Sequence, residues 1–203
     1  MKRSGWVRAL LTLSLLAILG VLAQASCGRI PPAPPPGRAF AERLEDLPGL
    51  GNLGRMAPGI YRGAQPTEEG LDRLKAMGIR SVVNLRHDFW EQEAPACRER
   101  GLEYLHLPLD SSGTPSDADV RRFLAWVTDP ARQPVFVHCH HGCDRTGTLC
   151  ACYRIAVDRW PLDDALREMD AFGFKRIWRD LRAYVGAFPD RRAEVWPDPP
   201  GRP

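Results

Sequence analysis

The sequence predicts an α/β fold in which a central, mainly parallel sheet is flanked by helices. Two observations predict it. Segments that resemble strands alternate with segments of helical periodicity from about residue 60 onward. In addition, the apolar run at 135–137 is suited to a fully buried strand, and it is followed by a short polar loop and a long apolar helix. A ligand of such a sheet binds at the carboxyl ends of its strands.

The elements follow one another in a regular order. A short strand at 60–62 precedes a helix with Thr67 as N-cap and acids in its first turn, which stops at Gly78. A buried strand at 80–85 leads to a charged helix at 91–100, and a strand at 103–107 is closed by Pro108. Ser116 and Asp119 form a capping box for the next helix. After the strand at 135–137, helices are predicted from Thr146 onward and around two apolar stripes, Leu162, Leu166 and Met169, then Ile177, Leu181, Val185 and Phe188.

The loop after the 135–137 strand concentrates residues that bind and attack anions. A loop between a buried strand and a helix N-terminus directs backbone N–H groups inward, and the helix dipole adds partial positive charge. Cys139 stands first in this loop, where the same field favours its thiolate. Arg145 stands last and presents a planar fork of donors suited to two phosphate oxygens. We call residues 139–145 the cysteine loop.

His138-Cys139, five residues, then Arg145-Thr146-Gly147 resembles the signature of the cysteine-dependent protein tyrosine phosphatases. The resemblance is greatest to the dual-specificity branch and to its bacterial and inositol-phosphatase-like relatives. It extends over about 58–188, and the segments at 61–66 and 81–86 resemble those of bacterial members. The resemblance implies a phosphatase that hydrolyses phosphate monoesters through a cysteinyl-phosphate intermediate and needs no metal or other cofactor.

The resemblance also implies roles for individual residues. Cys139 is expected to be the nucleophile and Arg145 to bind the phosphoryl oxygens. A general acid must protonate the leaving oxygen, and Asp110 in Leu107-Pro-Leu-Asp110 occupies the matching place. The Ser-Ser-Gly run at 111–113 would allow that loop to close over substrate. Asp144 is the rival, either as the acid or as a brace of the loop.

The other residues of the cysteine loop are expected to contact substrate, namely His140, His141, Gly142, Cys143 and Asp144 beside Arg145. His138 is expected to orient the loop, and Thr146 to donate a hydroxyl hydrogen bond to the sulfur or to cap the next helix. His140 and His141 either add positive charge for polyanionic substrates below neutral pH or form an exposed pair without a role. Lys175 either faces the pocket or is a solvated surface residue.

The first residues have the composition of a targeting segment. A basic stretch at 1–8 precedes an apolar run at 9–25 that ends in Ala23-Gln-Ala25, so 1–27 is predicted to be a signal peptide or an N-terminal membrane anchor. A lipid-bearing Cys27 is a third possibility. All three predict a domain exported or anchored in the bacterial inner membrane, on the periplasmic side.

The remaining boundaries follow from composition. A Pro/Gly-rich linker is predicted at 28–57, with 42–54 irregular, followed by the phosphatase domain at 58–190 and a flexible tail at 191–203. The chain has 203 residues and a net charge of only +3, so nothing favours a nucleic-acid partner, and a monomer is expected.

Several alternatives stay open. The substrate is a phosphotyrosine or phosphoserine/threonine protein, or an inositol phosphate or phosphoinositide. His138, Cys139, His140, His141 and Cys143 could ligate a metal, but structural zinc usually needs two paired clusters and this is one. A rhodanese-type sulfurtransferase and an inactive phosphate-binding module are the other rivals. A reversible disulfide from Cys139 to Cys143 or Cys97 would silence the nucleophile.

Overall fold

The computed structural model describes residues 39–88, 90–110 and 114–198. Within them a six-stranded sheet has the order β1-β2-β3-β6-β4-β5. Its strands are β1 (Glu42–Arg43), β2 (Gly54–Ala57), β3 (Ile60–Gly63), β4 (Ser81–Arg86), β5 (Glu103–Leu109) and β6 (Val135–His138). The strands β3, β6, β4 and β5 run parallel, while β1, β2 and β3 pair antiparallel. The predicted α/β fold with a mainly parallel sheet is therefore confirmed.

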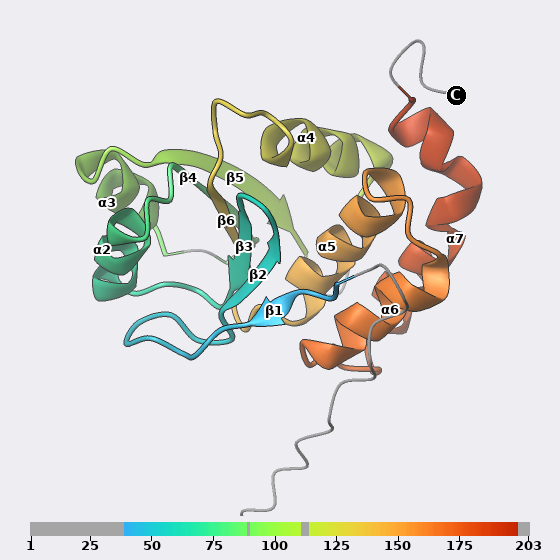
Figure 1. The fold of residues 1–203 in the computed structure, drawn as a ribbon, viewed down its shortest axis with the longest axis horizontal. Helices are drawn as coiled ribbons and strands as arrows, with labels where there is room; N and C mark the ends of the chain where they lie inside the picture. The colour runs from blue at the N-terminus through green and yellow to red at the C-terminus, as the bar shows by residue number, and fades with distance from the viewer. Residues whose placement is uncertain (1–38, 89, 111–113, 199–203) are drawn as a thin grey trace, which may run out of the picture. The chain divides into compact units, whose positions relative to one another are not determined.

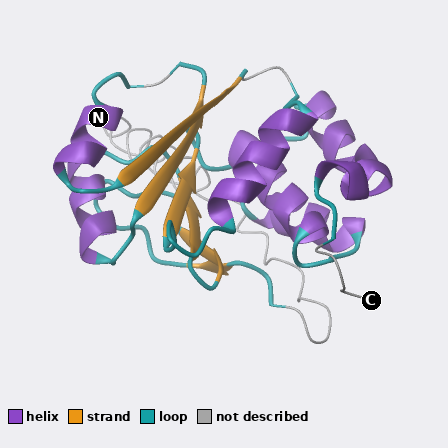
Figure 2. Cartoon of the chain, turned by 90° about the horizontal axis from the view of Figure 1, so that it is seen from above, coloured by secondary structure: helices purple, strands orange, loops and turns teal. Residues whose placement is uncertain are grey.

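Helices cover both faces of the sheet (Figures 1 and 2). On one face lie α2 (Glu68–Ala76) and α3 (Glu93–Glu99). On the other lie α4 (Asp117–Val127), α5 (Asp144–Ala156), α6 (Leu162–Ala171) and α7 (Arg179–Val195). Because β6 lies between β3 and β4, the loop that follows β6 emerges at the middle of the sheet edge.

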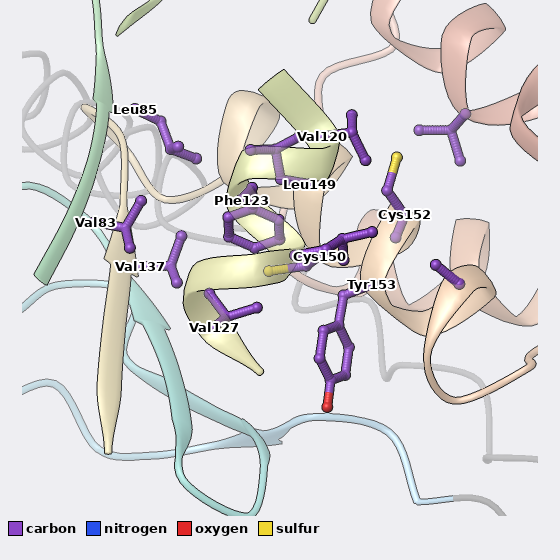
Figure 3. Packing of buried hydrophobic residues seen from close by; sticks show 14 of the residues in the cluster. Val83, Leu85, Val120, Phe123, Val127, Val137, Leu149, Cys150, Cys152 and Tyr153 are labelled. Carbon is purple, nitrogen blue, oxygen red and sulfur yellow. The ribbon is translucent and has the colours of Figure 1, made fainter. Parts of the chain in front are cut away.

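Alternate side chains of the central strands supply the two cores. Val82 and Phe136 pack with α2 and α3, whereas Val83 and Val137 pack with the four-helix side. Figure 3 shows Val137 among residues of that second cluster, including Phe123 of α4 and residues of α5. Both faces of β4 and β6 are buried, which explains why apolar residues stand side by side in them, Val82 next to Val83 and Val135 to Val137 in a row, instead of alternating with polar ones.

Capping residues in the sequence predicted most helix starts correctly. The Thr67 hydroxyl accepts a hydrogen bond from Gly70 N at 3.2 Å, and Ser116 and Asp119 form the predicted capping box. Three details were wrong. The strand β5 continues through Pro108, which an edge strand tolerates because the missing N–H is not needed by a neighbour. The helix α5 begins at Asp144, so Thr146 is inside it and does not cap it, and Ile177 precedes α7 and is 75% exposed.

The predicted linker at 28–57 includes residues that belong to the folded domain. Glu42–Arg43 and Gly54–Ala57 are strands of the same sheet, and β2 pairs with β3. Leu50, Leu53 and Met56 are buried. These strands are very short and carry exposed charged residues, which hid them in the sequence. At the other end α7 extends to Val195, so the predicted tail at 191–203 begins with helix.

The predicted localisation, exported or anchored in the bacterial inner membrane, is not upheld. Among the residues that the structure describes, no helix has the length and apolar character needed to cross a bilayer. The predicted signal peptide or anchor at 1–27 and the first part of the predicted linker, 28–38, lie outside the described residues.

Candidate active site

The cysteine loop leaves the carboxyl end of β6, where the fold predicts a ligand site. Cys139 directly follows His138 of β6 and is only 3% exposed. Cys143 is the N-cap of α5 and makes no side-chain capping bond, so the first N–H groups of this helix receive no acceptor from a cap. The loop therefore wraps around a helix N-terminus, with Cys139 at its start and Arg145 in the first helical turn.

Four consecutive carbonyl groups of the cysteine loop are held from outside the loop. Gln65 N donates to His140 O at 3.1 Å, Asn52 Nδ2 to His141 O at 3.0 Å, and Arg62 Nη2 to Gly142 O at 2.8 Å. His138 Nδ1 lies 3.2 Å from Cys139 O. In a trans peptide the C=O and the following N–H point in opposite directions. Fixing these four carbonyls outward thus turns four N–H groups, those of residues 140–143, inward.

These four N–H groups have no acceptor among the described residues. Together with the start of α5 they form a concave set of donors that matches a phosphate. Gly142 makes the curvature possible: its φ is +71°, and a Cβ on it would lie 2.4 Å from Gly63 O. Only glycine fits there, because both the left-handed backbone and the close approach to β3 exclude a side chain.

Arg145 is oriented toward the same opening. Its Nη1 donates to Leu109 O at 3.2 Å and lies 3.8 Å from Asp88 Oδ1. Its Nε and Nη2 have no hydrogen-bond partner among the described residues, which leaves two donors for a ligand. A hydrogen bond from Arg86 lowers the pKa of Asp88, with partial burial opposing and the Arg145 charge assisting, so this exposed carboxylate stays ionised.

The two candidate acids occupy different environments. Asp110 is exposed and follows Leu109, the residue whose carbonyl accepts from Arg145. The 111–113 run that was expected to close over substrate lies outside the described residues. Asp144 Oδ1 accepts a hydrogen bond from Lys175 N at 2.8 Å, so this carboxylate ties α5 to the connection between α6 and α7. The geometry of Asp144 is that of a brace.

His138 is fully buried beneath the cysteine loop and faces a buried carboxylate. Its Nε2 lies 2.9 Å from Glu93 Oε1, a close contact whose angle falls short of a regular hydrogen bond. Gln65, Asn84 and Tyr104 donate to the same carboxylate at 2.8, 2.6 and 3.1 Å. Burial opposes the charge of Glu93, but the contacts with His138, Gln65 and Tyr104 outweigh it and lower its pKa.

Four other expected residues are His140, His141, Thr146 and Lys175. The rings of His140 and His141 are exposed and 4.3 Å apart. Burial, with the charges of Arg86 and His141, lowers the pKa of His140, so its charge develops further into the acid range than that of an ordinary histidine. The Thr146 hydroxyl is buried and has no hydrogen-bond partner among the described residues, so the expected bond to the sulfur is not made. The Lys175 side chain is exposed, while its backbone N–H bonds Asp144.

The neighbouring cysteines differ in their suitability as disulfide partners. Cys97 packs in the core with α2 and α3, whereas Cys139 belongs to the cluster on the other face. Burial raises the pKa of Cys97 to about 12. Cys143 is half-buried, and burial, Asp144 and Cys139 raise its pKa. All five cysteines that the structure describes are free.

The alternative interpretation of the cysteine loop was a metal site. Within the described residues, no three His, Cys, Asp or Glu side chains are grouped so that they could hold a metal ion. His138 is engaged with Glu93 and Cys139 O, and the rings of His140 and His141 lie at the exposed rim.

Sequence reasoning missed the residues that support the cysteine loop from a distance, namely Asn52, Arg62, Gln65 and Glu93. Arg62 and Glu93 are both fully buried, and charged side chains are normally assigned to the surface. Asn52 has a φ of +51° in a turn of the segment that had been interpreted as linker. One signal was available: Arg62 and Gln65 belong to the 61–66 segment that resembles bacterial phosphatases.

Comparison with known proteins agrees with this geometry. A family model described as "DSP-PTPase phosphatase fused to NAD+ Kinase" matches residues 55–178. The chain is 34% identical over 187 residues to the dual specificity protein phosphatase TpbA of Pseudomonas aeruginosa, covering 89% of this chain and 79% of TpbA. It is 31% identical over 147 residues to the inositol diphosphatase DSP3 of Arabidopsis thaliana, covering 68% of this chain and 70% of DSP3.

Solved structures show the same likeness. A crystal structure of a cysteine-to-serine variant of P. aeruginosa TpbA in complex with phosphotyrosine has a TM-score of 0.67 and 30% identity, covering 81% of this chain and all of that one. The family match spans the sheet from β2 to the connection before α7 and includes the whole cysteine loop. The chain therefore belongs to the dual-specificity family of cysteine-dependent protein phosphatases.

Proposed function

We propose that this phosphatase hydrolyses phosphate monoesters of phosphotyrosine and phosphoserine/threonine proteins, with Cys139 as nucleophile, Arg145 as phosphoryl ligand and Asp110 as general acid. One observation carries the proposal. The carbonyls of residues 139–142 are all bonded outward, and the N–H groups of residues 140–143 around Cys139 have no acceptor in the described part of the chain. Such an arrangement has donors for a dianion already in place before substrate arrives.

The reaction then has two steps. In the first, the Cys139 sulfur forms a bond to phosphorus while the bond from phosphorus to the leaving oxygen breaks, and Asp110 gives that oxygen its proton. In the second, the Asp110 carboxylate takes a proton from water, whose oxygen attacks phosphorus and releases Cys139 as thiolate. The N–H groups and the free donors of Arg145 bind the three equatorial oxygens, whose charge is greatest in the transition state.

Asp144 is proposed as a brace that keeps the start of α5 in place. Its bond to Lys175 N holds one carboxylate oxygen within the protein. Asp110 is exposed, and its neighbour Leu109 contacts the phosphoryl-binding arginine, so it is the better placed proton donor.

An inositol phosphate is the second candidate substrate. The chain resembles an inositol diphosphatase at 31% identity, and the rim of the opening carries His140, His141 and the exposed Lys175. Such cationic groups would favour a substrate with several phosphates, particularly in acid.

Phosphate release by the full chain, with reductant and chelator present, tests the proposal. The substrates are an aryl phosphate, a phosphotyrosine peptide, a phosphoserine peptide and an inositol polyphosphate, each with the wild type and with Cys139→Ser. Turnover of the peptides that is abolished in Cys139→Ser supports the proposal. Faster turnover of the inositol polyphosphate than of either peptide favours the second candidate, and turnover by Cys139→Ser contradicts the mechanism.

A further inference from the structure

Arg62 is a fully buried arginine that underlies the cysteine loop. It lies on β3, paired in register with Val137 two residues before Cys139, and it is 0% exposed. Its Nη2 donates to Gly142 O at 2.8 Å, and its guanidinium carbon lies 4.1 Å from the centre of the Phe172 ring. The side chain is thus held between β3, the loop and the end of α6.

The charge of Arg62 has no partner within the described residues. Its Nε and Nη1 are buried without a hydrogen bond, and no carboxylate pairs with the guanidinium. An arginine keeps its positive charge in proteins, and burying a charge without a counter-charge is costly. Among the residues that the structure describes, no carboxylate neutralises this buried cation.

Arg154 shows what an ordinary buried arginine looks like in the same molecule. It is 4% exposed, stacks on Trp160 at 4.1 Å and donates to Met56 O at 2.6 Å, much as Arg62 does with Phe172 and Gly142. Arg154, however, also pairs with Glu168 and Asp158, each at 2.7 Å. The two arginines have similar burial and similar contacts, and they differ in whether a carboxylate neutralises them.

The negative charge that Arg62 lacks arises in the cysteine loop during the reaction. Burial raises the pKa of the nearby Cys143 and Cys150 thiols, and the charge of Arg62 opposes that rise in both. Cys139 interacts electrostatically with both of those thiols, so it shares the neighbourhood in which the Arg62 charge is felt. Holding Gly142 O also turns the Cys143 N–H into the loop.

We propose that Arg62 is a positioning residue of the reaction: its unpaired buried charge holds Cys139 as the thiolate, and its bond to Gly142 O keeps the Cys143 N–H directed at the phosphoryl group. This inference rests on the proposed role of Cys139. It gives the buried cation a counter-ion in each state, the thiolate before reaction and the bound phosphoryl group afterwards.

Other titratable or charged groups surround the loop and stay unchanged in the test. Those on β6, the loop and α5 are His138, His140, His141, Cys143, Asp144, Arg145 and Cys150. Those on the other elements are Arg86, Asp88, Glu93, Asp110 and Lys175. A change measured at Cys139 after substitution of Arg62 alone is therefore assigned to Arg62.

The experiment measures the rate of alkylation of Cys139 by iodoacetamide against pH in the full chain, with tandem mass spectrometry separating adducts on Cys139 from those on Cys143. Loss of the cation makes the thiolate less stable, so the neutral variants Arg62→Gln and Arg62→Met shift the midpoint upward by about one pH unit. Alkylation well below the midpoint then slows roughly tenfold, with no change at high pH. Arg62→Lys keeps the midpoint while lowering kcat/KM, because it retains the charge without the planar fork.

The matched control is Arg154→Met, which is expected to lose stability without moving the midpoint. A folded neutral variant with the wild-type midpoint would overturn the proposal. If neither neutral variant folds, Arg62→Lys is the deciding variant, because it keeps the positive charge. An upward shift of its alkylation midpoint by about one pH unit would contradict a role for the charge. Alkylation needs no substrate, so it reports on Arg62 even if the proposed substrates are not turned over.

Discussion

The buried carboxylate of Glu93 provides a quantitative test of how the site is held. In Glu93→Gln an amide NH₂ replaces one of two acceptor oxygens, while four groups point at them: His138 and Gln65 at Oε1, Asn84 and Tyr104 at Oε2. The two groups that contact the replaced oxygen then face an NH₂ donor and lose their acceptor. Because an unsatisfied buried polar group costs about 1–3 kcal/mol, the free energy of unfolding should fall by about 2–4 kcal/mol at pH 7.

The loss should depend on pH in a defined direction. The pKa of Glu93 is lower in the folded protein than its ordinary value of 4.5, so the folded state binds this proton more weakly than the unfolded state. The contribution of Glu93 is therefore complete above the unfolded-state pKa and declines as the pH falls through the lower folded-state pKa. The difference between wild type and Glu93→Gln should shrink over that acid range.

Urea unfolding under reductant, followed by circular dichroism at pH 7 and at several acid values, measures this. Glu69→Gln is the control, because Glu69 forms an exposed i,i+4 pair with Arg73 that should contribute less than about 0.5 kcal/mol. A loss in Glu93→Gln as small as in the control, or a loss that does not diminish in acid, would refute the reasoning.

Three further predictions concern the loop and its neighbours. Gly142→Ala should fold by circular dichroism but lose roughly 100-fold in kcat/KM, because its Cβ would displace the loop from Gly63; wild-type turnover would contradict this. Asp110→Asn should lower kcat about 100-fold or more for an alkyl phosphate and much less for an activated aryl phosphate, whose leaving group needs little protonation. Asp144→Asn should slow the two substrates equally. The reverse pattern would exchange the roles of the two residues. Cys97→Ser should leave peroxide inactivation at the wild-type rate, because burial keeps this thiol protonated, and protection by the substitution would restore Cys97 as a disulfide partner.

Much of the fold could be predicted because local signals and burial agreed. The adjacent apolar residues of β4 and β6, the Thr67 cap and the capping box at Ser116 each have a physical cause confined to a few residues. The position of the cysteine loop followed in turn, because a loop after a buried central strand emerges at the carboxyl edge of the sheet.

The missed parts depend on contacts between distant segments. The strands β1 and β2 are too short to show a period, and they form because they can pair with β3. Asn52 donates a hydrogen bond to His141 O, 89 residues away in the sequence, and Arg62 donates one to Gly142 O, 80 residues away. Apart from its place in the 61–66 segment, nothing local distinguishes the buried Arg62 from a surface arginine. Ile177 fits a helical stripe in the sequence, but it lies exposed before α7.

A trapped intermediate tests the central claim most directly. The full-length wild type and Asp110→Asn would be mixed with an aryl phosphate, quenched in acid within the first turnovers, digested and examined by tandem mass spectrometry. The account predicts one phosphoryl group on the sulfur of Cys139, with more of it in Asp110→Asn because that variant activates water poorly. A phosphoryl group on another side chain, or rapid turnover with Cys139 never modified, would contradict it.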